Sequence, residues 1–106
     1  MTTLIYQQRH FLHLFVQTTP IQRKALLQTV TTDQMKALSQ IAHNIIKGNV
    51  PLNSTERQKL KGERRFIHLL GDTRLGFVHK KGLVQSKQRI LRLIVNIAAT
   101  YLRSIL

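Results

Sequence analysis

Apolar residues recur along the chain every three to four positions, the spacing that gathers them on one face of a helix. No stretch alternates apolar and polar residues in the manner of a β-strand. The first amphipathic segment runs from about Leu4 to Val16, and a shorter one runs from about Pro20 to Gln28. Thr19 is suited to cap the second segment, because its hydroxyl can accept a bond from an amide of the first turn. The pattern predicts two helices before residue 30.

The next segment carries the clearest helix signals. Thr31 or Thr32 is suited to cap it. Apolar residues then follow at helical spacing, at Leu38, Ile41, Ala42, Ile45 and Ile46. Gly48 lies just past the last turn, where glycine is favoured because it adopts left-handed backbone without strain. Residues 49–53 are expected to be an extended connector, since the residue before Pro51 avoids the helical conformation, and this connector is the candidate hinge.

The second half of the chain predicts a long helix, a weak segment and a terminal helix. Asn53 and Glu56 have the spacing of a capping box for a helix that runs to about Leu70. Between residues 71 and 82 the helical signal weakens, and the segment fits either one helical turn or a loop. The last helix covers about residues 86–106 and is apolar around much of its circumference.

These segments predict an all-α fold, a small bundle of four to six helices with a long apolar C-terminal helix. We expect one domain over residues 1–106, because a chain of this length has material for a single core. The terminal helix could lie at the centre of the bundle, pair with a second copy or meet a membrane. Burial is favoured, and pairing would make residues 86–106 an assembly element of a homo-oligomer. A membrane is the least favoured, since the nearly uncharged stretch at residues 93–102 is about half of the ~20 residues that span a bilayer.

Charge narrows the range of partners. The chain has 17 Lys and Arg against 4 Asp and Glu, a formal net charge of +13. Self-repulsion of this size opposes a compact state, and a polyanionic partner relieves it. Nucleic acid is the commonest such partner, followed by an anionic membrane surface and an acidic protein face.

The same composition argues against most enzymes. Four carboxylates leave little material for acid–base pairs or oxygen-ligated metals, and the absence of cysteine excludes disulfides and thiolate zinc sites. His10 and His13 could both touch a metal, but no cysteine or nearby carboxylate completes a tetrahedral set. We therefore expect no enzyme activity, no metal and no cofactor. The apolar run at residues 11–16 is interrupted by His13 and lacks a cleavage site, so we expect no secretion by a signal peptide and, unless the protein is viral, an intracellular location.

Two basic clusters are the candidate phosphate contacts. On the helix predicted after Asn53, Arg57, Lys61, Arg64 and His68 fall in a narrow stripe at about 100° per residue. The second cluster leads into the terminal helix. The predicted nucleic-acid contacts are Arg57, Lys59, Lys61, Arg64, Arg65, Lys80, Lys81, Lys87 and Arg89. The alternative, that these charges only solvate an exposed face, stays open, and the sequence does not determine whether the two clusters share a face.

A motif in the middle of the chain resembles a known family. Residues 45–52, Ile-Ile-Lys-Gly-Asn-Val-Pro-Leu, followed by a basic helix and by Lys-Gly-Leu-Val-Gln at residues 81–85, are similar to small basic proteins of Maverick/Polinton-type elements and adintovirus-like DNA viruses. The resemblance covers about residues 21–85. It implies a virion core component that neutralises packaged DNA, located in the virion and the host nucleus. Family members often continue with a glycine-rich hydrophobic tail, whereas this chain continues with an aliphatic helix, so no tail-specific role is implied.

The favoured hypothesis is a non-enzymatic basic protein that binds duplex DNA without sequence preference and neutralises or condenses it. The alternative is a capsid-associated structural protein that contacts a capsid protein and assembles through its apolar C-terminal helix. A membrane-active terminal helix is the weaker third hypothesis.

Overall fold

Helices are the regular elements of the computed structural model, which describes the backbone of residues 2–105 and the side chains of residues 3–101. The elements are α1 (Thr2–Gln7), α2 (Arg9–Gln17), α3 (Pro20–Gln28), α4 (Thr32–Ile46), α5 (Ser54–Leu60), the 3₁₀ turn η1 (Lys61–Glu63), α6 (Arg64–Gly71), α7 (Phe77–Ser86) and α8 (Gln88–Ile105). No strand occurs in residues 2–105, so the predicted all-α class is confirmed for this part of the chain.

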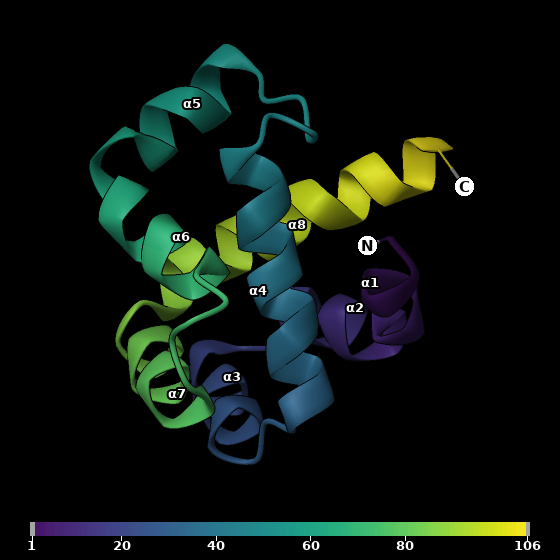
Figure 1. The fold of residues 1–106 in the computed structure, drawn as a ribbon. Helices are drawn as coiled ribbons and strands as arrows, with labels where there is room; N and C mark the ends of the chain where they lie inside the picture. The colour runs from purple at the N-terminus through teal and green to yellow at the C-terminus, as the bar shows by residue number, and fades with distance from the viewer. Residues whose placement is uncertain (1, 106) are drawn as a thin grey trace.

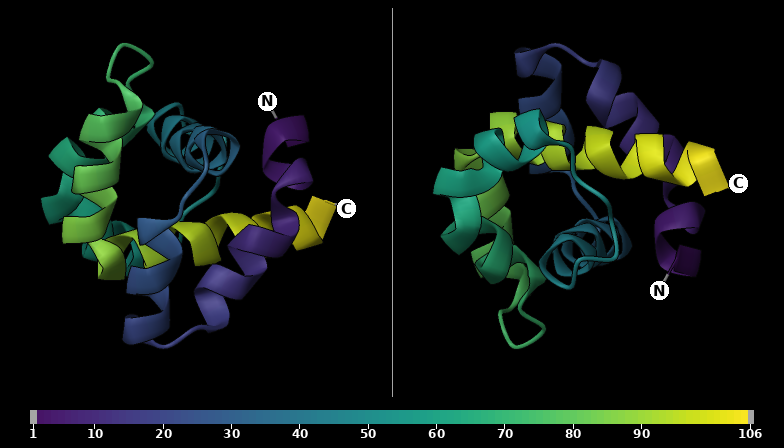
Figure 2. Two further views of the ribbon diagram at one scale, coloured as in Figure 1. Left: turned by 90° about the horizontal axis from the view of Figure 1, so that it is seen from below. Right: turned by 90° about the horizontal axis from the view of Figure 1, so that it is seen from above.

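The helices are arranged around α4. Helix α8 crosses α4, and the other helices surround this pair (Figure 1). Helices α1 and α2 lie on one side of α4, and α5, α6 and α7 lie on the other (Figure 2). Helix α4 packs against α6, α1 and α8, while α2 packs along α8 and α3 lies against α7. The radius of gyration of 12.5 Å is that of a compact chain of this length.

Local capping signals place the starts of three helices, α3, α4 and α5. Thr19, Thr31 and Asn53 each accept a bond from the backbone amide three residues on, and that residue's side chain bonds back to the cap. Thr31, rather than Thr32, is therefore the cap of α4. Gly48 has a φ of +74°, and its amide bonds to the Ile45 carbonyl, so α4 ends as predicted.

The predicted number of helices is too low because two expected helices contain a break. Between α1 and α2, Gln8 leaves the helical conformation, with φ −100° and ψ 18°. Between α5 and α6, the 3₁₀ turn η1 contains Gly62, and glycine is a poor former of continuous helix. The segment at residues 71–82, whose pattern suggested a single turn or a loop, instead contains the first six residues of a ten-residue helix, α7.

The prediction of a long apolar C-terminal helix is wrong in its apolar character. Helix α8 is amphipathic: Leu91, Ile94 and Val95 are fully buried, whereas Arg92 and Asn96 on the other face are exposed. Within the described residues, no helix combines the length and hydropathy that crossing a bilayer requires. The buried face packs against α2 and α4 of the same chain. The side chains of residues 102–106, the end of the predicted assembly element, lie outside the described residues.

Helices α4 and α6 approach closely where α6 ends, at Gly71. A Cβ atom on Gly71 would lie 3.1 Å from the backbone nitrogen of His43 and 3.3 Å from its Cα atom. Both atoms belong to the backbone of the last turn of α4, which cannot yield without a shift of that turn. Gly82, on the exposed surface of α7, has open space around the same position.

We expect Gly71→Ala to lower the free energy of unfolding by about 1–2 kcal/mol, because the added methyl group overpacks the contact between α4 and α6. Gly82→Ala is the matched control and should raise it by about 1 kcal/mol, since alanine is the better helix former. Urea denaturation followed by circular dichroism measures both. A Gly71→Ala protein as stable as the wild type would show that α4 and α6 are not in fixed contact.

Candidate nucleic-acid interface

A groove of about 700 Å³ lies between the C-terminal end of α4, the connector to α5, and the helices α5 and α6. Its apolar lining comes from Ile46, which is exposed, and from Ile45, Leu52, Leu60 and Ile67, which are buried or half-buried. Its basic lining comes from the whole predicted stripe: Arg57, Lys61, Arg64 and His68. These four basic side chains are exposed, so the groove is a positively charged surface above an apolar floor.

The stripe persists although the helix that was expected to carry it is broken. Arg57 belongs to α5, Lys61 to η1, and Arg64 and His68 to α6. A 3₁₀ turn of three residues changes the direction of the chain, yet the turn keeps Lys61 beside the groove. Lys59 and Arg65 are exposed on the same elements but do not line the groove.

Among the residues that the structure describes, no carboxylate lines the groove. Each of the four acids serves local structure elsewhere. Glu56 accepts the Asn53 amide in the cap of α5, and Asp33 lies in the first turn of α4. Glu63 pairs with Lys87 at 3.2 Å, and Asp72 pairs with Arg74 at 3.1 Å. The hydrogen bonds from Arg74 hold the pKa of Asp72 below its ordinary value. The positive charge of the groove is therefore not offset by acids in its lining.

The second basic cluster does not form one surface. Lys80 is only 7% exposed, and its Nζ donates to the Ser39 hydroxyl at 3.0 Å. Lys81 is half-buried and donates to the Gln28 carbonyl at 2.8 Å, which ties α7 to the end of α3. Lys87 pairs with Glu63 of η1, and Arg89 stays exposed at the start of α8. Burial removes Lys80 from the surface on which a phosphate backbone would lie, contrary to its predicted role.

Several cations bond to carbonyl groups at helix C-termini. Arg92 Nε donates to the Val16 carbonyl at 2.9 Å, and Arg23 Nη1 donates to the Thr18 carbonyl at 2.6 Å. The Val16 carbonyl lies in the last turn of α2 and the Gln28 carbonyl bonded by Lys81 lies at the end of α3, where the helix dipoles are negative, whereas the Thr18 carbonyl directly follows α2 in extended backbone. In a chain with few acids, backbone carbonyls thus take the place of carboxylates as the hydrogen-bond acceptors of these cations.

Arg23 and the environment of Lys80 were missed at the sequence level. Arg23 is 7% exposed, and its Nε atom is buried without a hydrogen-bond partner. Burial, together with repulsion from Arg92, lowers the pKa of Arg23. Each residue lies four positions before a fully buried apolar residue, Leu27 for Arg23 and Val84 for Lys80. That spacing was the available signal, but for Lys80 it has meaning only once residues 77–86 are known to be helical.

Comparisons with known proteins add no family: no family model, no curated protein and no solved structure matches the chain. The resemblance to viral and mobile-element basic proteins thus stays a prediction. In the structure, its first motif spans the end of α4 and the connector, and Ile45, Ile46 and Leu52 of that motif line the groove.

Stability should depend on pH through Lys80. Burial lowers the pKa of Lys80 below its ordinary value of 10.5, so between the lowered value and 10.5 the unfolded chain binds more protons than the folded chain. Stability contributed by this site therefore rises with pH through that window. The free energy of unfolding of the wild type, measured relative to that of Lys80→Met, should therefore increase as the pH is raised from 7 towards 10.5. Denaturant titrations at several pH values measure this difference. Lys24→Met removes the same charge from an exposed position, and an equal pH trend of the wild type relative to Lys24→Met would exclude burial as the cause.

Proposed function

We propose that this is a non-enzymatic basic protein that binds nucleic acid at the groove formed by α4, α5, η1 and α6. Its partner in this proposal is duplex DNA, which it neutralises or condenses without sequence preference. One observation carries the proposal: Arg57, Lys61, Arg64 and His68 meet at a groove without a single carboxylate in its lining, in a chain of net charge +13.

Electrostatics accounts for both affinity and lack of sequence preference. Each Lys or Arg that neutralises a phosphate releases condensed counterions, and this term is independent of the base sequence. The longest extent of the molecule is 31 Å, which corresponds to about nine base pairs at ~3.4 Å per base pair. A short duplex is therefore long enough to cover the whole basic surface.

The aromatic side chains favour duplex over single-stranded nucleic acid. Single-strand binding proteins stack bases on exposed aromatic rings beside a basic channel. Here Phe11, Phe15 and Phe66 are buried in the core, and no aromatic side chain lines the groove. Exposed Tyr6 belongs to α1, on the other side of α4, where Arg9 already lies over its ring at 4.1 Å.

A capsid-associated interaction protein is the second candidate. The apolar lining of the groove favours it, because a phosphate backbone would leave Ile46 and Leu52 uncovered, whereas an acidic amphipathic helix would cover them. Assembly through the C-terminal helix has less support, since the apolar face of α8 up to residue 101 packs within the chain. The link to a virion, and with it a location in the virion and host nucleus, rests on the resemblance alone.

Neutralising the groove should weaken DNA binding and flatten its salt dependence. In the variant with Arg57→Gln, Lys61→Gln and Arg64→Gln, three phosphate contacts are lost. The slope of log affinity against log salt should therefore fall in magnitude by about 2.7, at ~0.9 per contact. Fluorescence anisotropy with a random-sequence duplex of 20 base pairs, across a salt series, measures affinity and slope.

The matched control loses the same charge elsewhere, through Arg9→Gln, Lys24→Gln and Lys36→Gln, all at exposed positions outside the groove. It should keep most of the wild-type slope. Equal slopes for the two triple variants would mean that DNA binds the molecule by diffuse charge and not at the groove. If wild-type binding is weak and the slope shallow, the protein candidate takes precedence, and an acidic amphipathic peptide becomes the next probe.

A further inference from the structure

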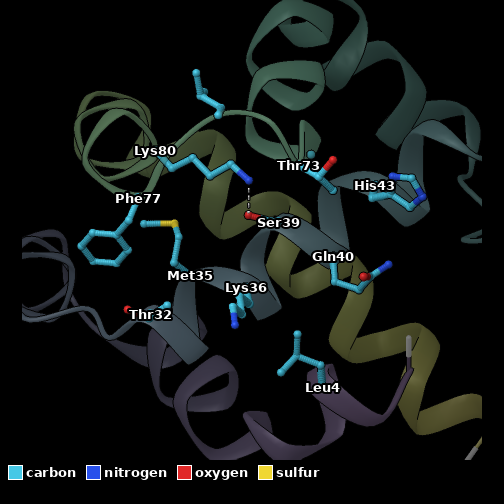
Figure 3. Close-up of a pocket in the computed structure, with 12 residues that line it drawn as sticks. Leu4, Thr32, Met35, Lys36, Ser39, Gln40, His43, Thr73, Phe77 and Lys80 are labelled. Carbon is cyan, nitrogen blue, oxygen red and sulfur yellow. Dashed lines mark hydrogen bonds between the residues drawn. The ribbon is translucent and has the colours of Figure 1, made fainter.

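A second cavity, of about 420 Å³, lies along α4 on the N-terminal side of the groove. The two sites share no lining residue among those that the structure describes. It is bounded by α4, α7, the chain after α6 and α1 (Figure 3). Leu4, Met35, Leu75 and Phe77 supply apolar walls. Pockets with largely apolar walls and a few convergent polar groups are the usual form of small-molecule sites.

Lys80 provides the buried charge of this cavity, which Lys36 also lines from an exposed position. Its side chain extends from α7 towards α4, and the ammonium group donates to the Ser39 hydroxyl at 3.0 Å (Figure 3). Lys80 is only 7% exposed, yet it has no ion pair among the described residues. The nearest source of negative charge, Asp72, attracts Lys80 only at a distance and gives its two oxygens to Arg74, at 3.1 and 3.2 Å.

A buried ammonium group without a paired anion is costly, and proteins normally pair or neutralise such a group. The lowered pKa of Lys80 is a sign of this cost. An anionic group that entered the cavity would supply the missing counter-charge, and the Ser39 hydroxyl would donate a second hydrogen bond to it. The site thus has one buried cation and one neutral donor at the end of an apolar chamber.

We propose that this cavity binds a small organic monocarboxylate, with its carboxylate on Lys80 and Ser39 and its aliphatic body between Met35 and Phe77. The buried ammonium group of Lys80 balances one negative charge, whereas the charge of the exposed Lys36 is solvated, so a single carboxylate fits better than a doubly charged phosphate. The apolar walls require a ligand with an aliphatic body, which excludes acetate and inorganic anions as good ligands. The proposal does not depend on nucleic-acid binding, because the two sites have no lining residue in common.

Octanoate is the probe, with 1-octanol and acetate as its apolar and anionic halves. Titrations of the full chain by calorimetry and by ¹⁵N-resolved NMR are run at 0.15 M salt, where diffuse attraction to the surface is largely screened. We expect octanoate to shift the amide signals around Ser39 and Phe77 and to bind about tenfold or more tightly than either half.

Lys80→Met should weaken octanoate binding by about tenfold or more and bring it to the level of 1-octanol, since it removes the charge and keeps an aliphatic side chain of similar length. Lys24→Met, which lowers the net charge equally, should leave it unchanged. The comparison of octanoate with 1-octanol on the wild-type protein needs no variant and stands even if Lys80→Met fails to fold. Equal binding of these two compounds, unchanged affinity in a folded Lys80→Met, or shifts centred on the basic groove would overturn the proposal.

Discussion

Both candidate sites depend on the contact between α4 and α6 at Gly71. There the backbone of α4 lies so close that a Cβ atom would stand 3.1 Å from the His43 nitrogen. Towards its C-terminus, α4 forms one wall of the basic groove with Ile45, and α6 forms the facing wall with Ile67. Towards its N-terminus, the same helix lines the cavity of Lys80 with Met35 and Ser39. A single helix held on one side by α6 thus separates the groove of the exposed basic stripe from the cavity of the buried Lys80.

The second organising constraint is the shortage of acids. With 4 carboxylates for 17 Lys and Arg, most cations have no possibility of an ion pair. The fold uses some of them as donors to helix C-termini, as Lys81, Arg23 and Arg92 show. These bonds link α7 to α3 and α8 to α2, so part of the basic character stabilises the tertiary structure. Among the described residues, the cations of the groove make no such bond, and this supports the proposal that they bind an external polyanion.

Sequence reasoning succeeded where the signal is local. The caps at Thr19, Thr31 and Asn53 and the stop at Gly48 involve residues within one turn of each other, and each was readable from spacing. The basic stripe could also be predicted from local spacing, since its members are neighbours along one surface of the chain. The apolar character of α8 was overstated, because composition alone cannot tell a helix that is apolar all round from one whose polar residues are few but gathered on one face.

The sequence by itself determined the helical class, most helix ends, the surplus of positive charge and the residues of the basic stripe. Only the tertiary structure decided which cations remain available. The partners Lys80 and Ser39 are separated by 41 residues, Lys81 and Gln28 by 53, and Arg92 and Val16 by 76. Bonds over such separations follow from how helices pack, and packing depends on the shape of the whole core rather than on spacing within one helix. For that reason two adjacent lysines, which the sequence does not distinguish, lie in different environments: Lys80 is buried beside a cavity, and Lys81 joins α7 to α3.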